Sequence, residues 1–514
     1  MSSPIPISTQ MLLHYGKAPA LSDGQQTLNY QQVADKVTRV SQWLASLPAQ
    51  RIAIRGPNTL SWIIADLSLA QSQKICVPIP RFFSQAQQSH ILQFAEIDLI
   101  LDTELTADSL PTPVPDLWYQ PVSSLERMPY SRSIPMDSGK ITFTSGTTGT
   151  PKGVCLSWSQ QAKTLQGLQD ALAEIADNDN LVHLCLLPLA TLLENQAGVY
   201  LPLALGQQIL VLPEQTTGLS GSSRLDLQSF AHTLLHYQPN SMILTPQLLM
   251  ALLWICQQHP ILLNQFRFLA VGGAHCSPHL LQQAQQLGLP VYQGYGLSEA
   301  GSVVTLNLPS ANSIGTVGRA LSHLQIRIQQ QRIEVKGSLF SGYVGEPAPA
   351  SDSWLDTGDL GTIDDAGFLT ITGRSKHLLI TSFGRNISPE WIEAEVQLCP
   401  AVAQVLILGD AKPWLSAIIV LSAQSAGSVL YHQITALNRR LPDYAQIRGV
   451  VLAHEPFSVT NKQLTENGRL RREQIMTRYQ TAIAALYCKA NPSAELLIQS
   501  SHEEHHDELL PTFN

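Results

Sequence analysis

Short apolar runs alternate with longer stretches of helical periodicity over about the first 300 residues of the chain. The apolar runs lie at 51–55, 141–144, 208–212, 241–244 and 268–271. Between them, apolar residues recur every three or four positions, for example over 30–47 and 279–287, as they do on one face of a helix. This alternation predicts an α/β fold with mostly parallel strands.

The pattern changes after about residue 309. Residues 325–372 read as short strands separated by Gly and Asp turns, and a shorter α+β succession follows them. We therefore predict a large N-terminal domain of layered β-sheets with helices over 1–374 and a small α+β domain over 375–490. Residues 491–514 are predicted to form a polar tail. Its His502-Glu-Glu-His-His506 fits a zinc-binding pattern, but we interpret it as a solvated terminus.

Composition and charge indicate which partners and which cellular setting to expect. The chain has 514 residues, of which 44% are hydrophobic and 14% charged, and its formal net charge is −8. This charge does not favour nucleic acid as a partner. The seven cysteines form no CxxC pair, which favours reduced thiols and a cytoplasmic setting. We expect neither a signal peptide nor a membrane span, because the N-terminus has no basic segment followed by an apolar one and no apolar run reaches about 18 residues.

The strongest chemical signal follows the apolar run at 141–144. The segment 144–153 reads Thr-Ser-Gly-Thr-Thr-Gly-Thr-Pro-Lys-Gly and combines three glycines, five hydroxyls and one lysine. Glycines leave backbone N–H groups unobstructed, and the lysine adds a positive charge, so the loop suits a polyphosphate. It is not a Walker A loop, because Pro151 occupies the position of the second glycine and Gly153 follows the lysine.

This loop resembles the signature phosphate loop of the adenylate-forming superfamily, which includes acyl-CoA synthetases, firefly-type luciferases and peptide-synthetase adenylation domains. The resemblance implies that the loop holds the β- and γ-phosphates of ATP. The implied phosphate contacts are Thr144, Ser145, Gly146, Thr147, Thr148, Gly149 and Lys152. Thr148 and Lys152 are also expected to take part in catalysis.

Further motifs follow in the order of that family. The sequence Tyr295-Gly296-Leu-Ser298-Glu299 resembles Y-G-x-T-E, with serine in place of threonine. The resemblance implies that Tyr295 stacks on adenine, that Gly296 and Ser298 line the nucleotide site, and that Glu299 binds Mg²⁺ and is catalytic. A carboxylate is a suitable partner, because Mg²⁺ is usually bound by one or two carboxylates plus phosphate oxygens.

Two more segments resemble nucleotide-binding parts of the family. Gly272-Gly273-Ala274 follows the apolar run at 268–271 and resembles the segment that lies against adenine and the acyl carboxylate. Residues 354–359 resemble W-x-x-T-G-D, which implies that Asp359 binds the ribose hydroxyls. Arg374, in a Thr-Gly-Arg-Ser-Lys sequence, is expected to contact ribose or phosphate.

The small domain carries the remaining motifs. Lys376 matches the hinge about which this domain rotates in the family, so we expect a mobile lid. The stretch 382–390 resembles a loop that reaches the active site during thioester formation, which makes Gly384 and Asn386 candidates for the thiol-acceptor loop.

Weaker sequence signals indicate which carboxylic acid is activated and which thiol accepts the acyl group. Residues 187–194 resemble the P-L-A-H-x-x-E segment of long-chain acyl-CoA synthetases, with Thr191 in place of histidine and Glu194 retained. We assign Thr191, Glu194, Thr245 and Gly272 to the acyl-substrate region and expect a fatty or other apolar acid, with an aryl acid as an alternative. The thiol acceptor is CoA or the phosphopantetheine of an acyl carrier protein.

One position departs from the family. Its C-terminal T-x-x-G-K-x-x-R motif reads Thr465-Glu-Asn-Gly-Arg469-Leu-Arg-Arg472 in this chain, with arginine in place of the catalytic lysine. Arginine keeps the positive charge but presents a planar fork. Three interpretations remain: Arg469 performs the lysine's role, Lys462 replaces it, or the protein binds nucleotide or acyl-AMP with impaired adenylation.

Overall fold

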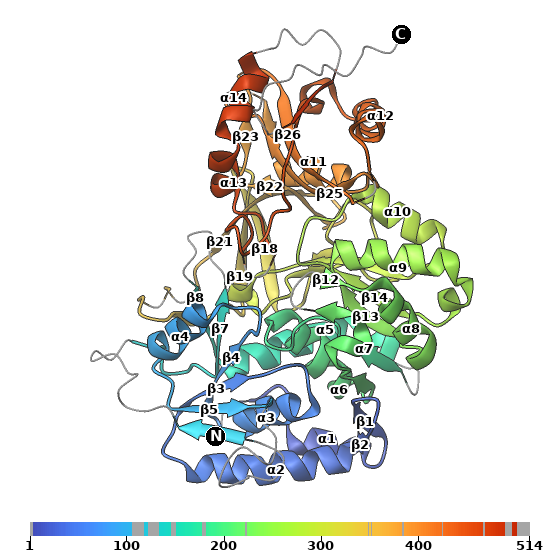
Figure 1. The fold of residues 1–514 in the computed structure, drawn as a ribbon. Coiled ribbons are helices and arrows are strands. Elements are labelled where there is room, and N and C mark those ends of the chain that lie inside the picture. The colour runs from blue at the N-terminus through green and yellow to red at the C-terminus, as the bar shows by residue number, and fades with distance from the viewer. Residues whose placement is uncertain are drawn as a thin grey trace. The chain divides into compact units, whose positions relative to one another are not determined.

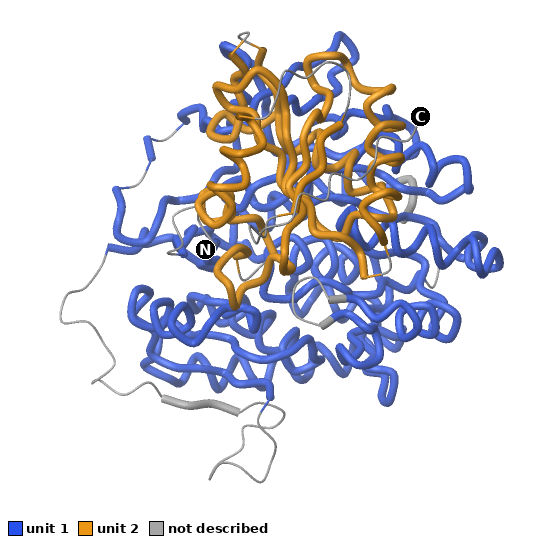
Figure 2. Tube along the Cα trace, turned by 45° about the horizontal axis from the view of Figure 1, so that its top comes forward, with its two compact units in different colours: residues 1–372 blue, residues 373–514 orange. Residues whose placement is uncertain are grey.

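A computed structural model describes residues 4–104, 118–121, 133–144, 151–176, 181–220, 224–347, 349–350, 352–382, 385–423, 425–465, 468–488 and 496–500. The chain divides into two compact units, residues 1–372 and residues 373–514, which Figure 2 shows in different colours. The predicted mixed α/β class, with layered sheets and a separate C-terminal domain, is confirmed. Among the described residues, no helix combines the length and apolarity that a membrane span needs.

The first sheet of the larger unit has nine strands in the order β17-β16-β15-β14-β13-β9-β10-β1-β2. Its strands are β1 (Pro19–Ser22), β2 (Thr27–Asn29), β9 (Val182–Leu184), β10 (Gln208–Leu210), β13 (Ser241–Leu244), β14 (Phe268–Val271), β15 (Val291–Tyr295), β16 (Thr305–Leu306) and β17 (Arg319–Ala320). The pairs from β1 through β10, β9, β13 and β14 to β15 are parallel. Their carboxyl ends therefore share one edge of the sheet.

The second sheet has seven strands in the order β20-β8-β7-β4-β3-β5-β6. Its strands are β3 (Arg51–Arg55), β4 (Ile75–Ile79), β5 (Leu99–Asp102), β6 (Trp118–Pro121), β7 (Lys140–Thr144), β8 (Lys152–Leu156) and β20 (Gly342–Tyr343). Strands β7 and β8 are antiparallel, with Thr144 opposite Lys152. The predicted phosphate loop therefore connects the two strands of a hairpin.

Helices pack on these sheets, as Figure 1 shows for α2, α3, α5 and α9. They are α1 (Thr9–Tyr15), α2 (Tyr30–Ser46), α3 (Leu60–Gln71), α4 (Gln85–Phe94), α5 (Trp158–Ala176), α6 (Leu201–Ala204), α7 (Glu214–Thr217), α8 (Leu227–Tyr237), α9 (Pro246–Gln258) and α10 (Pro278–Gln286). Helix α2 begins with a capping box between Asn29 and Gln32. The π-helix η3 (Glu194–Tyr200), which periodicity did not predict, runs directly into α6.

The larger unit also contains smaller sheets. Strands β18 (Leu324–Gln329), β19 (Arg332–Gly337), β21 (Leu355–Ile363) and β22 (Leu369–Arg374) form one sheet in that order, and β11 (Leu219–Ser220) pairs with β12 (Arg224–Leu225). The division between the two units falls inside β22.

The smaller unit has a four-stranded sheet that is buried on both faces. Its strands are β25 (Val402–Leu408), β26 (Leu415–Leu421), β27 (Ile447–Leu452) and β28 (Leu497–Ser500), and β23 (Leu379–Ile380) pairs with β24 (Asn386–Ile387) nearby in sequence. Alternate side chains of β25 and β26 pack against α11 (Pro389–Val396) and α12 (Gly427–Asn438) on one face. Those between them pack against α13 (Arg472–Arg478) and α14 (Gln480–Cys488) on the other.

The predicted polar tail needs one correction. Residues Leu497–Ser500 form β28 and pair in parallel with β27, so part of the segment assigned to the tail belongs to the sheet. The strand is short and ends in Gln499 and Ser500, so its apolar part, Leu497 and Ile498, gave no strand pattern in the sequence. The His502–His506 segment lies outside the described residues.

Candidate active site

Strand ends bring several of the predicted residues to one edge of the nine-stranded sheet. Leu244 pairs with Val271, and Val271 pairs with Gln293, so the segments that follow β13 and β14 emerge beside the end of β15. This arrangement gathers Thr245, Gly272–Ala274 and Tyr295–Gly296. Ligands of parallel α/β sheets bind at the carboxyl ends of the strands, so this edge is the natural position for a nucleotide.

Glycines keep this edge open and allow its close turns. Gly273 has a φ of +78°, and a Cβ placed there would meet no atom within 4 Å. A Cβ on Gly296 would lie 1.7 Å from the carbonyl oxygen of Ser302, so only glycine fits there. Gly273 and Ala274 are exposed. The edge at Gly273 is therefore open to a ligand.

Tyr295 and Asp359 meet at this edge, although they come from different sheets. The Tyr295 hydroxyl donates a hydrogen bond to Oδ2 of Asp359 at 2.6 Å, across 64 positions of sequence. Asp359 lies in β21, and its backbone N–H donates to the Thr357 hydroxyl at 3.1 Å. The structure therefore brings together the residue expected to stack on adenine and the carboxylate expected to bind ribose.

Glu299 has a defined partner. It lies in the 3₁₀ turn η5 (Ser298–Ala300), and its Oε1 accepts a hydrogen bond of 2.8 Å from the Tyr343 hydroxyl. Burial and the nearby Glu299 carboxylate raise the pKa of the Tyr343 hydroxyl, so Tyr343 stays a donor at physiological pH. Ser298 is half-buried at the start of the same turn.

Lys152 extends this group toward the phosphate loop. Its Nζ lies 3.1 Å from Oε1 of Glu346 and 5.1 Å from the centroid of the Tyr343 ring. The ring of Tyr343 thus lies between the lysine that ends the loop and the predicted Mg²⁺ ligand. Sequence reasoning missed Tyr343 and Glu346, because no local motif marks a contact that spans 194 positions.

The phosphate loop itself is only partly described. Thr144 ends β7 and is half-buried, and Lys152 begins β8 and is exposed. The remaining predicted phosphate contacts, Ser145, Gly146, Thr147, Thr148 and Gly149, lie outside the described residues, as does Gly384. Their roles stay predictions.

Of the residues assigned to the acyl-substrate region, Thr245 and Gly272 lie at the strand edge, whereas Glu194 is buried. The Thr191 hydroxyl donates to the carbonyl of Pro188 at 2.7 Å, and the Thr245 hydroxyl caps α9 by accepting from Leu248 N–H at 3.3 Å. Glu194 is completely buried beside His183 and Cys185. Gly272 lies at the strand edge, where a Cβ would lie 3.3 Å from the carbonyl oxygen of Gly294.

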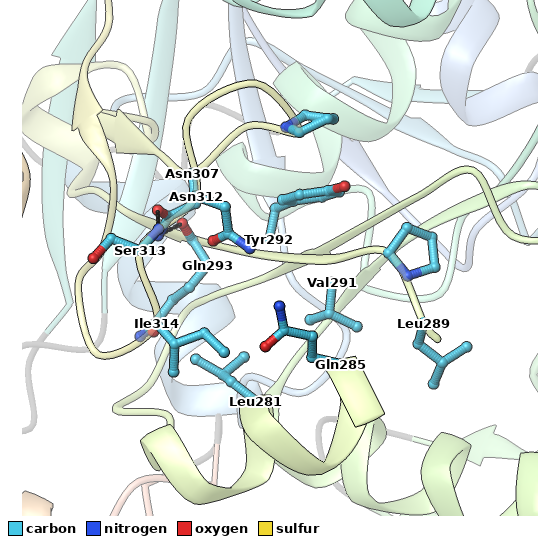
Figure 3. Close-up of a pocket in the computed structure, with 12 residues that line it drawn as sticks. Leu281, Gln285, Leu289, Val291, Tyr292, Gln293, Asn307, Asn312, Ser313 and Ile314 are labelled. Carbon is cyan, nitrogen blue, oxygen red and sulfur yellow. Dashed lines mark hydrogen bonds between the residues drawn. The ribbon is translucent and has the colours of Figure 1, made fainter. Parts of the chain in front are cut away.

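A pocket of about 280 Å³ lies between α10, β15 and the segment 307–314. Figure 3 shows Gln285, Gln293 and Asn312 around it together with apolar side chains such as Leu281 and Ile314. None of its lining residues belongs to the predicted site, so it does not support an acyl pocket at the strand edge.

The predicted residues of the smaller unit are accessible. Arg374, Lys376, Asn386 and Arg469 are all exposed. Arg469 sits in a turn that is closed by two hydrogen bonds to Thr465, of 2.7 Å from Thr465 N–H to the Arg469 carbonyl and 3.0 Å from Arg469 N–H to the Thr465 hydroxyl.

Arg472, three positions later, anchors this turn to α11. Its Nη2 lies 2.5 Å from Oε2 of Glu393 and 3.6 Å from Oε1 of Glu390, and Glu390 also contacts Nδ1 of His377 at 2.6 Å. The sequence motif predicted the arginine but not these partners.

Comparison with known proteins identifies the family. The profile of the AMP-binding enzyme family matches residues 10–342, and that of the AMP-binding enzyme C-terminal domain matches residues 376–491. A long-chain-fatty-acid–CoA ligase of Mycobacterium bovis is 26% identical over 466 residues, which cover 77% of each chain. The 2-succinylbenzoate–CoA ligase of Enterococcus faecalis is 25% identical over 472 residues, covering 86% of this chain and 93% of the relative.

Solved structures share the fold. The anthranilate–CoA ligase AuaEII in complex with anthranoyl-AMP superposes with a TM-score of 0.74 at 16% identity, covering 94% of this chain and 99% of that one. The O-succinylbenzoate–CoA synthetase of Bacillus subtilis in complex with AMP gives 0.70 at 20% identity, covering 90% and 97%. The predicted resemblance, and with it the prediction of a ligase of this family, are confirmed. This chain belongs to the AMP-binding enzyme family.

Proposed function

We propose that this enzyme activates an apolar carboxylic acid with Mg·ATP to form acyl-AMP and pyrophosphate, and then transfers the acyl group to the thiol of CoA. The observation that supports this best is the 2.6 Å contact between Tyr295 and Asp359 at the carboxyl edge of the parallel strands. It joins an aromatic ring and a carboxylate, which are the groups that adenine stacking and a ribose diol require.

The donor groups around this edge fit Mg·ATP. Glu299 offers a carboxylate to Mg²⁺, which would neutralise phosphate charge and orient the α-phosphorus, and Tyr343 holds that carboxylate in place. Lys152, at the end of the phosphate loop, is exposed and adds a positive charge. Arg469 supplies the positive charge that the displacement needs when the smaller unit rotates about Lys376.

The second step belongs to the stretch 382–390. After adenylation, rotation of the smaller unit would bring Asn386 and its neighbours to the acyl-AMP, where the CoA thiol attacks the acyl carbon and AMP leaves. The setting proposed is the cytoplasm, which agrees with seven unpaired cysteines. The preference for an apolar acid rests on the 187–194 segment, while the relatives named above include ligases of both fatty and aryl acids.

A panel assay tests both steps. Pyrophosphate release is measured with fatty acids of several chain lengths, 2-succinylbenzoate and anthranilate, and acyl transfer is then measured with CoA or with a phosphopantetheine-bearing carrier protein. We expect release with apolar acids and thioester formation with CoA. Thioester formation with the carrier protein alone would identify an acyl-AMP ligase. If no acid gave release, the protein would be an adenylation-impaired binder, which Arg469 makes the second candidate.

A further inference from the structure

A compact set of metal-ligating side chains lies inside the larger unit, and the proposed adenylation chemistry does not use it. His183 in β9, Cys185 just after that strand and Glu194 at the start of η3 each offer one ligand atom, and these atoms all lie within 4.8 Å of one another. The side chains of His183 and Glu194 are 4% and 0% exposed, and Cys185 is 1% exposed.

Three buried polar atoms of this cluster make no hydrogen bond within the described part of the chain. Both carboxylate oxygens of Glu194 and Nε2 of His183 are buried and unpaired, and Nε2 of His183 lies 3.9 Å from Oε1 of Glu194. A buried carboxylate without a partner costs several kcal/mol, so it must be neutralised by a proton or by a cation. The 3.9 Å separation is too long for a direct hydrogen bond that would satisfy both groups.

A hydrogen bond to Ser241 orients the His183 ring so that Nε2 faces Glu194. Nδ1 of His183 lies 2.9 Å from the Ser241 hydroxyl on the neighbouring strand β13. When Nδ1–H donates to this oxygen, the lone pair of Nε2 is directed inward, which is how an outer hydrogen bond commonly orients a metal-binding imidazole.

The position beside both groups carries no side chain. Residue 198 in η3 is glycine, and a Cβ there would lie 2.8 Å from Oε1 of Glu194 and 3.1 Å from Nε2 of His183. The carbonyl oxygen of Gly198 lies 3.4 Å from Sγ of Cys185. Glycine therefore leaves open the volume beside Oε1 of Glu194 and Nε2 of His183. A π-helical turn, which is uncommon and often found at functional sites, positions Glu194 and Gly198 together.

We propose that His183, Cys185 and Glu194 bind one divalent transition-metal ion, for which Zn²⁺ is the best chemical match. Nitrogen, sulfur and oxygen ligands of this kind are those of protein zinc sites. Zinc bonds of about 2.0–2.3 Å in tetrahedral geometry place ligand atoms about 3.3–3.7 Å apart, so side-chain shifts of less than about 1 Å close the site. A thiolate and a carboxylate together carry two negative charges, which a dication balances.

Burial disfavours an uncompensated carboxylate and thiolate, and a bound dication would offset that cost. The ion would connect β9 to the π-helix at the end of the 187–194 segment.

Metal analysis of the full chain tests the proposal. The protein is purified without a histidine tag, in a background with His502, His505 and His506 changed to Ala, so that the terminal segment adds no metal. We expect about one Zn²⁺ per chain, and a near-ultraviolet thiolate-to-cobalt band after unfolding and refolding with Co²⁺. Cys185→Ser and Glu194→Gln should lower the metal content at least tenfold, whereas Cys256→Ser, a buried cysteine of α9, should leave it unchanged.

If Cys185→Ser does not fold, two further results show whether this cluster binds a metal ion. Gly198→Ala fills the space beside the ligand atoms without removing any of them, and it should also lower the metal content at least tenfold. The folded parent protein provides the other result. If it contains no stoichiometric metal, shows no cobalt band, and keeps its unfolding temperature in the presence of a chelator, the proposal is wrong. This test does not depend on ATP turnover, so it can fail or succeed separately from the proposed ligase activity.

Discussion

Asp359 and Asp356 lie on the same strand but have different partners. Substituting each of them in turn therefore distinguishes a residue that binds nucleotide from one that pairs only within the protein. Both lie in β21, but Asp359 accepts from Tyr295, whereas Asp356 pairs with Arg332 at 2.6 Å on an exposed surface. A carboxylate that accepts from both ribose hydroxyls contributes charge-assisted hydrogen bonds, each worth about 1.5–3 kcal/mol.

We therefore expect Asp359→Asn to raise the KM for ATP by about 10-fold to 100-fold, because asparagine accepts more weakly and carries no charge. Asp356→Asn should change this KM less than about twofold. Steady-state pyrophosphate release at varied ATP provides the measurement, with circular dichroism to show that both variants fold. Equal KM values for the two variants would contradict the assignment of Asp359 to ribose.

Arg469 is the second residue whose role in adenylation can be tested by substitution. Its turn is fixed by the two hydrogen bonds to Thr465, and the exposed Lys462 lies on the same segment with a φ of +62°. If Arg469 supplies the charge for adenylation, Arg469→Ala should lower the rate of adenylation by about 100-fold, similar to the loss of one electrostatic donor in other active sites.

Arg469→Lys should retain or increase that rate, since it restores the ammonium of the family motif, and Lys462→Ala should retain it. Single-turnover formation of acyl-AMP measures this step without thiol transfer. A large loss with Lys462→Ala, together with normal rates for Arg469→Ala, would instead assign the role to Lys462.

At the scale of secondary-structure elements, one buried network connects α3, β7 and η3. Lys140 at the start of β7 lies 2.6 Å from Asp66 of α3 and donates at 2.9 Å to the Tyr200 hydroxyl. Asp66 also accepts from Asn195 at 2.9 Å and from Tyr200 at 2.5 Å. Both charged side chains are 1% exposed. The strand that leads into the phosphate loop is thus tied to the π-helix of the acyl-substrate segment.

Lys140→Met should destabilise the larger unit by about 3–5 kcal/mol, because it leaves the Asp66 carboxylate buried without its cation. The double variant Lys140→Met with Asp66→Asn should be more stable than the sum of the two single losses predicts, since it buries no charge. Urea unfolding followed by tryptophan fluorescence measures all four proteins of this cycle. Additive losses would show that the two residues do not interact.

At the scale of the whole molecule, local patterns and long-range contacts were predictable to different degrees. The parallel strands, the helices over 30–47 and 279–287 and the edge that gathers Gly272 and Tyr295 follow from periodicity and from the order of the motifs. The contacts of Tyr343 with Glu299 and of Lys140 with Asp66 do not follow from local patterns. The partners are 44 and 74 positions apart in sequence, and only the tertiary fold brings them together. The π-helix was also missed, since its buried Glu194, Asn195 and Gln196 interrupt an apolar pattern.

The two units should respond separately to acid, and Glu390 provides the test in the smaller one. Although burial opposes its ionisation, the hydrogen bond from His377 and the charge of Arg472 lower the pKa of Glu390 from 4.5 to about 2. A carboxyl whose pKa is lower in the folded state stabilises that state above the unfolded value, and this stabilisation is lost as the pH falls. For Glu390 the loss occurs between about pH 4.5 and about pH 2.

We therefore expect Glu390→Gln to destabilise residues 373–514 by about 1–3 kcal/mol at pH 7, with the difference from the parent protein disappearing as the pH approaches 2. Hydrogen exchange at increasing urea concentrations, followed by peptide mass analysis, reports the unfolding of each unit separately. Peptides of residues 1–372 should be unaffected, because this unit has its own core. Glu473→Gln, at an exposed position of α13, serves as the control. If the difference between Glu390→Gln and the parent were the same at every pH, the ion pairs of Glu390 would not stabilise the smaller unit.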